Sequence, residues 1–246
     1  GKKIDYINVS PLVRESGSPD LVRDIHQDKK GWVWVGLDRS GVVMINPQHR
    51  HGIVFKHDPV DTTTIADNTV YCIHEDSRGI LWMGTSRGLS AFDPQRGNFK
   101  NYTIRDGLPN NVVYAILEDE KGFLWLSTNY GLARFHHKLG VVATFNSEDG
   151  LQGNEFNSAA YYRAENGEMF FGGVGGITHF QPLQINENPY LPPLVITNGK
   201  IGEQPVLHRI ADGDTLILPS SNNQLHLAFS ALNFIRSSEN KYRYRI

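Results

Sequence analysis

The feature that most constrains this chain of 246 residues is a segment that occurs four times along it. The copies read DLVRDIHQDKKGWVWVGLDRSGVVMINP, NTVYCIHEDSRGILWMGTSRGLSAFDP, NVVYAILEDEKGFLWLSTNYGLARFHH and NSAAYYRAENGEMFFGGVGGITHFQP, and they begin near Asp20, Asn68, Asn111 and Asn157. Each copy carries one anchor aromatic residue, namely Trp34, Trp82, Trp125 and Phe170. A period of about 45 residues is typical of the four-stranded blade of a β-propeller.

The second copy shows how the strands of one blade follow from its turns. Residues 70–75 and 80–85 are expected to form a hairpin, residues 89–93 a third strand and residues 99–104 a more polar outer strand. An Asp that opens a turn bonds its own backbone, and a Gly three residues later accepts positive φ. This Asp-x-x-Gly spacing occurs in three copies, at Asp28, Asp76 and Asp119 with Gly31, Gly79 and Gly122.

Strands that are apolar on both faces need a neighbour on each side, which blades arranged around an axis provide. Residues 4–8 resemble an outer strand, and the fourth copy shows no evident outer strand of its own. Either residues 4–8 close the ring on the last blade, or they belong to an earlier blade. We favour the second interpretation, an arc of a larger propeller, because closure with four blades is uncommon.

A second domain is predicted after the blades. The sequence Asn-Pro-Tyr-Leu-Pro-Pro at residues 188–193 is a stiff linker, which divides the chain into residues 1–188 and 189–246. Short strands are expected at residues 195–197, 216–218, 224–230 and 242–246. Leu225, Leu227 and Phe229 alternate with His226 and Ala228, which predicts one buried face and part of an immunoglobulin-like β-sandwich.

Composition excludes several classes of function. The net charge is −2 with no block of like charge, so no nucleic-acid partner is expected. Cys72 is the only cysteine, so no internal disulfide can form. No apolar run reaches the roughly 18 to 20 residues of a membrane helix, and the chain starts with Gly1 and stops inside a predicted strand. We therefore interpret it as part of a longer protein, with any membrane helix outside this segment.

Several residues that could suggest chemistry have a structural explanation. Trp34, Trp82 and Trp125 share one repeat position, which favours the core over a sugar-stacking role. The loop histidines lack convergent partners for zinc; they are His49, His51, His136 and His137. Neighbouring carboxylates point to opposite faces of a strand and cannot share a substrate; these pairs are Glu75 with Asp76 and Glu118 with Asp119. No catalytic residue, metal or cofactor is predicted.

The candidate ligand-binding residues lie in loops that the repeat does not explain, because a rigid scaffold often displays function on its loops. Residues that begin the first strands, such as Asn68 and Asn111, more often bond local backbone. The candidates between the second and third strands are Asp38, Arg39, Arg87, Asn129 and Tyr130. Those in the connections between blades are Asn110, Asn154 and Glu155. Both sets are expected at the same end of the propeller.

Particular segments also resemble a known family. EDSRGILWMGTSRGLSAFDP and EDEKGFLWLSTNYGLARF resemble the two-component regulator propeller repeat. DGLPNN, EDGLQGNEFNSAAYY and GEMFFGGVGGITHFQP resemble its penultimate and final blades, and LAFSALNFIRSSENKYRYRI resembles the start of the Tyr-rich Y-Y-Y domain. The chain departs from the repeat at His136-His137, where other copies have a residue followed by Pro, and at Phe170, where they have Trp.

The resemblance implies the periplasmic sensor region of an inner-membrane signalling protein, whose output would be a cytoplasmic histidine kinase or GGDEF-type cyclase. The expected function is binding of a small molecule or oligosaccharide, without enzymatic activity in this segment, and with a homodimer formed through the sandwich domain. A propeller that binds another protein is the alternative. A propeller glycoside hydrolase is a third reading, less favoured because no catalytic set converges.

Overall fold

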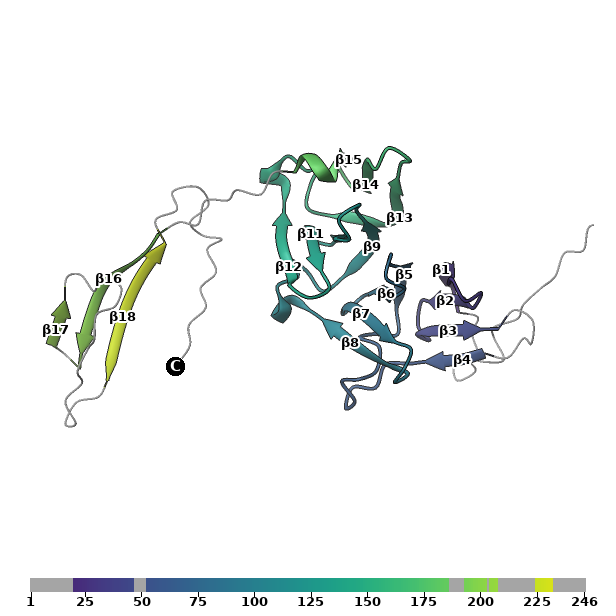
Figure 1. The fold of residues 1–246 in the computed structure, drawn as a ribbon, viewed down its shortest axis with the longest axis horizontal. Helices are drawn as coiled ribbons and strands as arrows, with labels where there is room; N and C mark the ends of the chain where they lie inside the picture. Colours follow the sequence, from purple (N-terminus) through teal and green to yellow (C-terminus); the bar gives the residue numbers. More distant parts are fainter. Residues whose placement is uncertain (1–19, 47–51, 186–192, 203, 208–223, 232–246) are drawn as a thin grey trace, which may run out of the picture. The chain divides into compact units, whose positions relative to one another are not determined.

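The computed structural model of the chain describes residues 20–46, 52–185, 193–202, 204–207 and 224–231 (Figure 1). The chain divides into two compact units, residues 1–185 and 186–246, and each is described by itself. Strands make up most of the described residues of both units, and three short 3-10 turns are the helical elements among them. The prediction of an all-β fold is confirmed.

The described residues of the first unit form four antiparallel sheets, each made of consecutive strands. The first blade contains β1 (Val22–Gln27), β2 (Val33–Leu37), β3 (Val42–Ile45) and β4 (Gly52–Phe55). The second contains β5 (Val70–Glu75), β6 (Leu81–Thr85), β7 (Gly88–Asp93) and β8 (Asn98–Tyr102). The third contains β9 (Val113–Glu118), β10 (Leu124–Thr128), β11 (Gly131–His136) and β12 (Gly140–Phe145). The fourth has three strands within the described residues: β13 (Phe156–Arg163), β14 (Met169–Gly173) and β15 (Gly176–Phe180).

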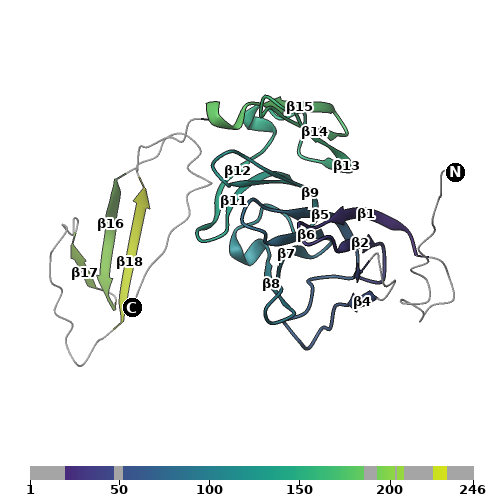
Figure 2. The same cartoon turned by 45° about the vertical axis from the view of Figure 1, so that its right-hand side comes forward.

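The blades are arranged side by side through their first strands. β1 contacts β5, β5 contacts β9, and β9 contacts β13, so that these innermost strands converge while the later strands of each blade lie outward (Figures 1 and 2). The predicted arrangement of four propeller blades is therefore confirmed. The predicted strand at residues 4–8 lies outside the described residues, and the open arc stays a prediction.

Each gap between blades contains a core built around the tryptophan of the repeat position. Trp34, Trp82 and Trp125 are each 1% exposed, which confirms that they belong to the core. Each indole lies against a phenylalanine from the third strand of the next blade, with ring centroids 5.0, 5.3 and 4.7 Å apart. These partners are Phe92, Phe135 and Phe180. Contacts between edge-on or tilted rings add to the apolar burial that holds the blades together.

A repeated hydrogen bond ties each of these tryptophans to a turn of its own blade. The Trp82 indole nitrogen donates to Asp76 Oδ2 over 2.9 Å, and the backbone N–H groups of Arg78 and Ile80 donate to Asp76 Oδ1. The same indole bond joins Trp34 to Asp28 and Trp125 to Asp119, each at 2.9 Å. The Asp therefore both forms the turn and anchors the core. The sequence had indicated the turn role alone.

The fourth copy has lost both partners of this bond together. Ala164 opens the same turn, because the Gly167 N–H donates to the Ala164 carbonyl, and Phe170 follows at the tryptophan position. An aspartate without an indole donor would be buried at a cost, as would an indole N–H without an acceptor. With Ala164 and Phe170 at these two positions, the fourth copy leaves neither an indole N–H nor a carboxylate without its partner.

Two details of the predicted strands needed correction. The outer strand expected at residues 99–104 ends at Tyr102, because Thr103 caps a short 3-10 turn at Ile104–Asp106. The structural counterpart of Asn111 in the fourth copy is Asn154, three residues before the predicted Asn157. The side-chain oxygens of both residues accept a backbone N–H from the preceding 3-10 turn, at 2.9 and 2.8 Å. A bulge between Phe156 and Tyr161 accounts for the offset.

The second unit contains one described sheet, in the order β17 (Gln204–Leu207), β16 (Leu194–Ile201) and β18 (Leu225–Ala231). The strands expected at residues 195–197 and 224–230 fall in β16 and β18, whereas those at 216–218 and 242–246 lie outside the described residues. The predicted burial of one face of β18 is wrong for this sheet. Leu225, Leu227 and Phe229 are 37%, 42% and 42% exposed, because no second described sheet covers them.

The absence of both the Asp and the Trp from the fourth copy leads to a first prediction about the second copy. Asp76→Ala leaves the buried Trp82 indole without its acceptor and should cost about 2 to 4 kcal/mol of unfolding free energy. Combining Asp76→Ala with Trp82→Phe should cost about 1 to 2 kcal/mol less than the sum of the single changes, because the lost donor no longer needs a partner. Urea unfolding followed by circular dichroism measures the cycle, and strictly additive costs would contradict the bond.

A second repeated contact links neighbouring blades. Glu75 accepts the backbone N–H of Lys29 at 2.8 Å, and Glu118 accepts both the N–H and the hydroxyl of Ser77 at 2.7 Å. In each case the glutamate of one blade holds the first turn of the blade before it. His74 Nε2 lies 3.8 Å from Glu118 Oε2, which is close enough for an ion pair but too long for a hydrogen bond. Burial lowers the pKa of His74. The negative charge of Glu118 raises this pKa and so opposes the effect of burial, but only in part.

The lowered pKa of His74 predicts a loss of stability on acidification. In the unfolded chain the pKa of His74 is about 6.5, which is higher than its pKa in the folded protein. The contribution of the neutral His74 side chain to the free energy of unfolding is therefore complete above that pH. The contribution is lost as the pH falls below about 6.5 toward the folded-state pKa. In His74→Leu, which introduces the residue found at the equivalent position Leu117, the urea midpoint should fall less between pH 7.5 and 5.5 than in the original chain. Equal losses would refute this assignment.

Candidate functional site

The predicted ligand-binding residues lie at one end of the blades, which we call the turn face. It is formed by the β2–β3, β6–β7 and β10–β11 turns together with the connections between blades. The Gly41 N–H donates to the Asn68 carbonyl at 2.8 Å, and the Gly131 N–H donates to the Asn154 carbonyl at 2.6 Å. These bonds join the turn of one blade to the connection that enters the next. The two sets of predicted loop residues therefore share one end of the propeller.

Several predicted residues are held by structural bonds on this face. Asp38 accepts two hydrogen bonds from the Arg23 guanidinium, at 2.8 and 2.5 Å. The Arg39 N–H donates to Asp20 at 3.3 Å. The side-chain oxygens of Asn110 and Asn154 accept local backbone N–H groups, each at 2.8 Å. These asparagines shape the connections, which leaves less of their hydrogen-bonding capacity for a ligand.

Other predicted residues present their side chains to solvent. Arg87, Asn129, Tyr130 and Glu155 are exposed, and the Tyr130 side chain is displayed at the tip of the β10–β11 turn with 53% of its surface accessible. The backbone N–H of Tyr130 donates to the buried hydroxyl of Thr128, which fixes the turn that carries it. A binding role for these side chains stays a prediction.

Sequence reasoning missed three residues on the innermost strands. Arg23, Tyr71 and Tyr114 each lie at an irregularity where a first strand has one residue more than its partner, beside the turn face. A bulge of this kind re-aims a side chain and often occurs near functional sites. The signal in the sequence was weak, because the repeat position holds Arg in one copy and Tyr in the next two.

These three residues, the inner-strand cluster, form a continuous chain across three blades. The Tyr71 and Tyr114 rings meet edge to face with centroids 5.0 Å apart, and the Arg23 guanidinium lies 5.7 Å from the Tyr71 ring. Burial raises the pKa of Tyr71, and Tyr114 contributes to the same shift. The Tyr71 phenol therefore stays a neutral donor and acceptor at neutral pH. Arg23 also joins the cluster to the predicted loops through its ion pair with Asp38.

The chemistry of the turn face suits binding. Ring faces, phenol groups and a guanidinium offer stacking and hydrogen bonding to a polar ligand.

The reactive side chains elsewhere in the blades have structural roles. Burial raises the pKa of the Cys72 thiol, which therefore stays protonated. Asp76 and Asp119 are occupied by their indole bonds, and Glu75 and Glu118 by neighbouring turns. Within the described part of the chain, no group of three or more His, Cys, Asp or Glu side chains gathers to hold a metal.

Comparison with known proteins supports the resemblance found in the sequence. Residues 64–87 and 107–130 match the family model described as two component regulator propeller. These segments cover the first hairpins of the second and third blades, so the regulator-propeller repeat is confirmed there. The similarity of the last residues to the Tyr-rich domain stays a prediction.

Two solved structures of similar fold are extracellular domains of proteins described as bacterial two component or one component systems. The extracellular domain of BT3049 from B. thetaiotaomicron, described as a hybrid two component system, is 27% identical with a TM-score of 0.62 and covers 85% of this chain. That of BT4673, described as a one component system, is 18% identical with a TM-score of 0.57 over 80% of this chain and shares the fold. The chain spans 29% of each of these domains.

A curated relative has a signalling name as well. Histidine kinase P4 of Formosa agariphila is 33% identical over 102 residues, which are 38% of this chain and 7% of that protein. Together with the extracellular domains, this relative supports a sensing role for the chain. None of the helices among the residues placed by the structure has the length and apolar character to cross a membrane.

The glycine that ends each turn on the turn face provides a further prediction. Gly131 has a φ of +89°, and a Cβ there would lie 2.0 Å from the Phe145 carbonyl oxygen of the outer strand. Gly131→Ala should therefore cost about 3 kcal/mol of unfolding free energy. Gly176, its counterpart at the start of β15, meets nothing within 4 Å, so Gly176→Ala should cost less, about 1 to 2 kcal/mol, from the backbone strain at its φ of +133° alone. Equal urea midpoints would refute this explanation.

Proposed function

We propose that this chain is the ligand-sensing segment of a bacterial transmembrane receptor and that it works in the periplasm. A small molecule, of the oligosaccharide class, binds the turn face over the inner-strand cluster. The similarity to the extracellular domain of BT3049, which has 27% identity over 85% of this chain, supports the periplasmic location. The inner-strand cluster carries the binding proposal, because it places two phenols and a guanidinium at the convergence of three blades.

Signal output belongs to the same proposal. The relative named histidine kinase favours a kinase over a GGDEF-type cyclase as the cytoplasmic output. Binding would change the output only if the ligand prefers one arrangement of the receptor over another. A homodimer formed through residues 189–246 would provide two such arrangements.

A thermal-shift panel of oligosaccharides tests the binding proposal on the chain itself. A ligand at one hundred times its dissociation constant stabilises by about 2.7 kcal/mol, which raises the melting midpoint by about 5 to 10 °C. Tyr71→Ala should weaken binding of the responding oligosaccharide at least tenfold, because the central ring of the cluster is lost. Tyr162→Ala, which removes a tyrosine on β13 that is 62% exposed, is the matched control and should leave affinity unchanged.

Three outcomes would contradict the proposal. If no oligosaccharide shifts the midpoint and the chain instead retains one purified protein stoichiometrically, the propeller is a protein-binding scaffold. If a panel member is cleaved, the chain is a hydrolase. If affinity survives Tyr71→Ala unchanged, the ligand does not bind at the inner-strand cluster.

A further inference from the structure

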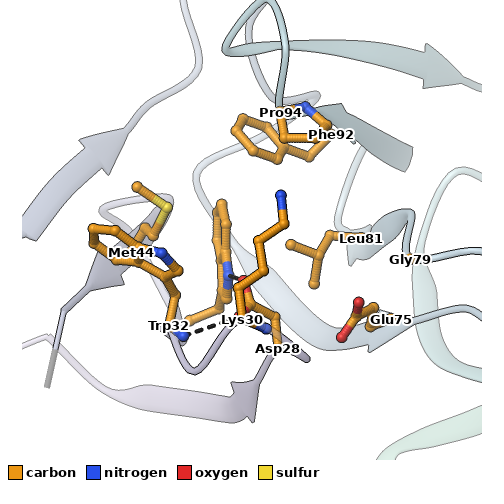
Figure 3. Close-up of a pocket in the computed structure, with 10 residues that line it drawn as sticks. Asp28, Lys30, Trp32, Met44, Glu75, Gly79, Leu81, Phe92 and Pro94 are labelled. Atoms are coloured by element: carbon orange, nitrogen blue, oxygen red, sulfur yellow. Dashed lines mark hydrogen bonds between the residues drawn. The ribbon is translucent and has the colours of Figure 1, made fainter.

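A pocket of about 230 Å³ lies between the first and second blades, at the end opposite the turn face. The Asp-x-x-Gly turns of the two blades form its rim, and its walls come from both blades (Figure 3). Trp32 lines it from the first blade, and Leu81, Phe92 and Pro94 line it from the second. None of these residues is among the predicted ligand-binding residues. The Trp32 indole is partly exposed, in contrast to the buried repeat tryptophans.

Comparison with the next gap shows why a pocket exists here. At the position of Lys30 the second blade has Arg78, whose guanidinium pairs with Asp76 at 2.6 Å and contacts His137 of the third blade. His137 stands where the second blade has Pro94. In the second gap an arginine thus bridges the two blades across the corresponding space, whereas in the first gap Lys30 faces a proline.

The third gap is filled in another way. Arg134 occupies the strand position that Met44 has in the first blade, and its guanidinium lies 3.9 Å from the centre of the Phe123 ring. Phe123 is the counterpart of Trp32. An arginine therefore stacks beneath the aromatic residue in the third blade, and the first blade has a methionine instead. The first gap combines a large aromatic wall with no arginine filling it.

The charged residues that line this pocket are two carboxylates, Asp28 and Glu75, and one ammonium, Lys30. Asp28 is engaged by the backbone N–H groups of Lys30 and Trp32 and by the Trp34 indole, each at 2.9 Å. Glu75 accepts the Lys29 N–H. Lys30 is exposed, and its ammonium has no ion-pair partner among the residues placed by the structure. Figure 3 shows its side chain extending along the pocket with the nitrogen toward Phe92 and Pro94.

We infer that this pocket binds a small aromatic carboxylate. The ring would pack between Trp32 and the apolar wall of Leu81 and Phe92, and the carboxylate would pair with the Lys30 ammonium. An apolar cavity of about 150 Å³ is sufficient for a benzene ring, so this volume admits such a ring with its acidic substituent. Because Asp28 and Glu75 are already engaged, few polar groups remain for the hydroxyls of a sugar. The inference does not depend on the function proposed for the turn face.

Phenylacetate is the probe, and its binding to the chain is measured by calorimetry and tryptophan fluorescence. Trp32→Ile introduces the residue of the next repeat, Ile80, and removes the aromatic wall. Lys30→Met keeps the aliphatic stem and removes the charge. Lys121→Met, at the equivalent position of the third repeat, is the matched control. Phenylacetamide has the same ring without the charge, and melting midpoints report whether each variant remains folded.

The inference predicts saturable binding of phenylacetate that both pocket variants weaken at least tenfold and that Lys121→Met leaves unchanged. Phenylacetamide should bind at least tenfold more weakly than phenylacetate. Absence of saturable binding, unchanged affinity in Lys30→Met, or equal affinity for phenylacetamide would each overturn it. The result for Lys30→Met decides the question even where Trp32→Ile lowers the melting midpoint, and neither variant touches the inner-strand cluster.

Discussion

The buried hydrogen bond between an aspartate and a tryptophan underlies the organisation of the blades. Burial by itself would raise the pKa of Asp76, but the hydrogen bonds from Trp82, Ile80 and Arg78 together lower it. The carboxylate therefore stays charged and is stabilised by the donors around it. One end of this bond fixes the first turn of the blade, and the other fixes the indole that fills the gap to the next blade. Local turn chemistry and packing between blades are thus joined in one residue pair.

The fourth copy shows what changes when this pair is absent. Phe170 is only partly buried, whereas Trp125 is 1% exposed, and Tyr162 and Ile177 on the same blade are 62% and 69% exposed. The other blades cover the corresponding surface with the next blade in the chain. An indole whose N–H needs a buried acceptor is useful inside a sealed gap, whereas a phenylalanine carries no such requirement. The fourth copy therefore lacks the buried donor and the buried acceptor together, so that neither is left without its partner.

The sequence predicted the repeat, the order of the strands and the buried tryptophans, because these depend on periodicity and turn residues within one copy. It did not predict that Asp76 and Trp82 bond each other, since six residues separate them and only the folded hairpin brings them together. The end of the outer strand at Tyr102 depends on the cap formed by Thr103, which apolar patterning does not reveal. Arg23 and Tyr71 escaped notice because a bulge is a property of two paired strands, whereas a sequence pattern describes one. The two sets of loop residues were predicted to share one end of the blades, and they do, but their bonds to local backbone could be seen only in the structure.

The two ends of the blades differ in how far their residues are committed to the fold. At the end that carries the Asp-x-x-Gly turns, Asp28, Asp76 and Asp119 hold the backbone in the same way in three copies. The residues between and after the Asp and Gly are free to vary, and they do: Lys30, Arg78 and Lys121 occupy one position, and Trp32, Ile80 and Phe123 another. Because the hydrogen bonds of the aspartate secure the turn, a change at these positions alters the gap between blades without disturbing the hairpin. The same constraint that makes the blades alike therefore lets each gap acquire its own chemistry.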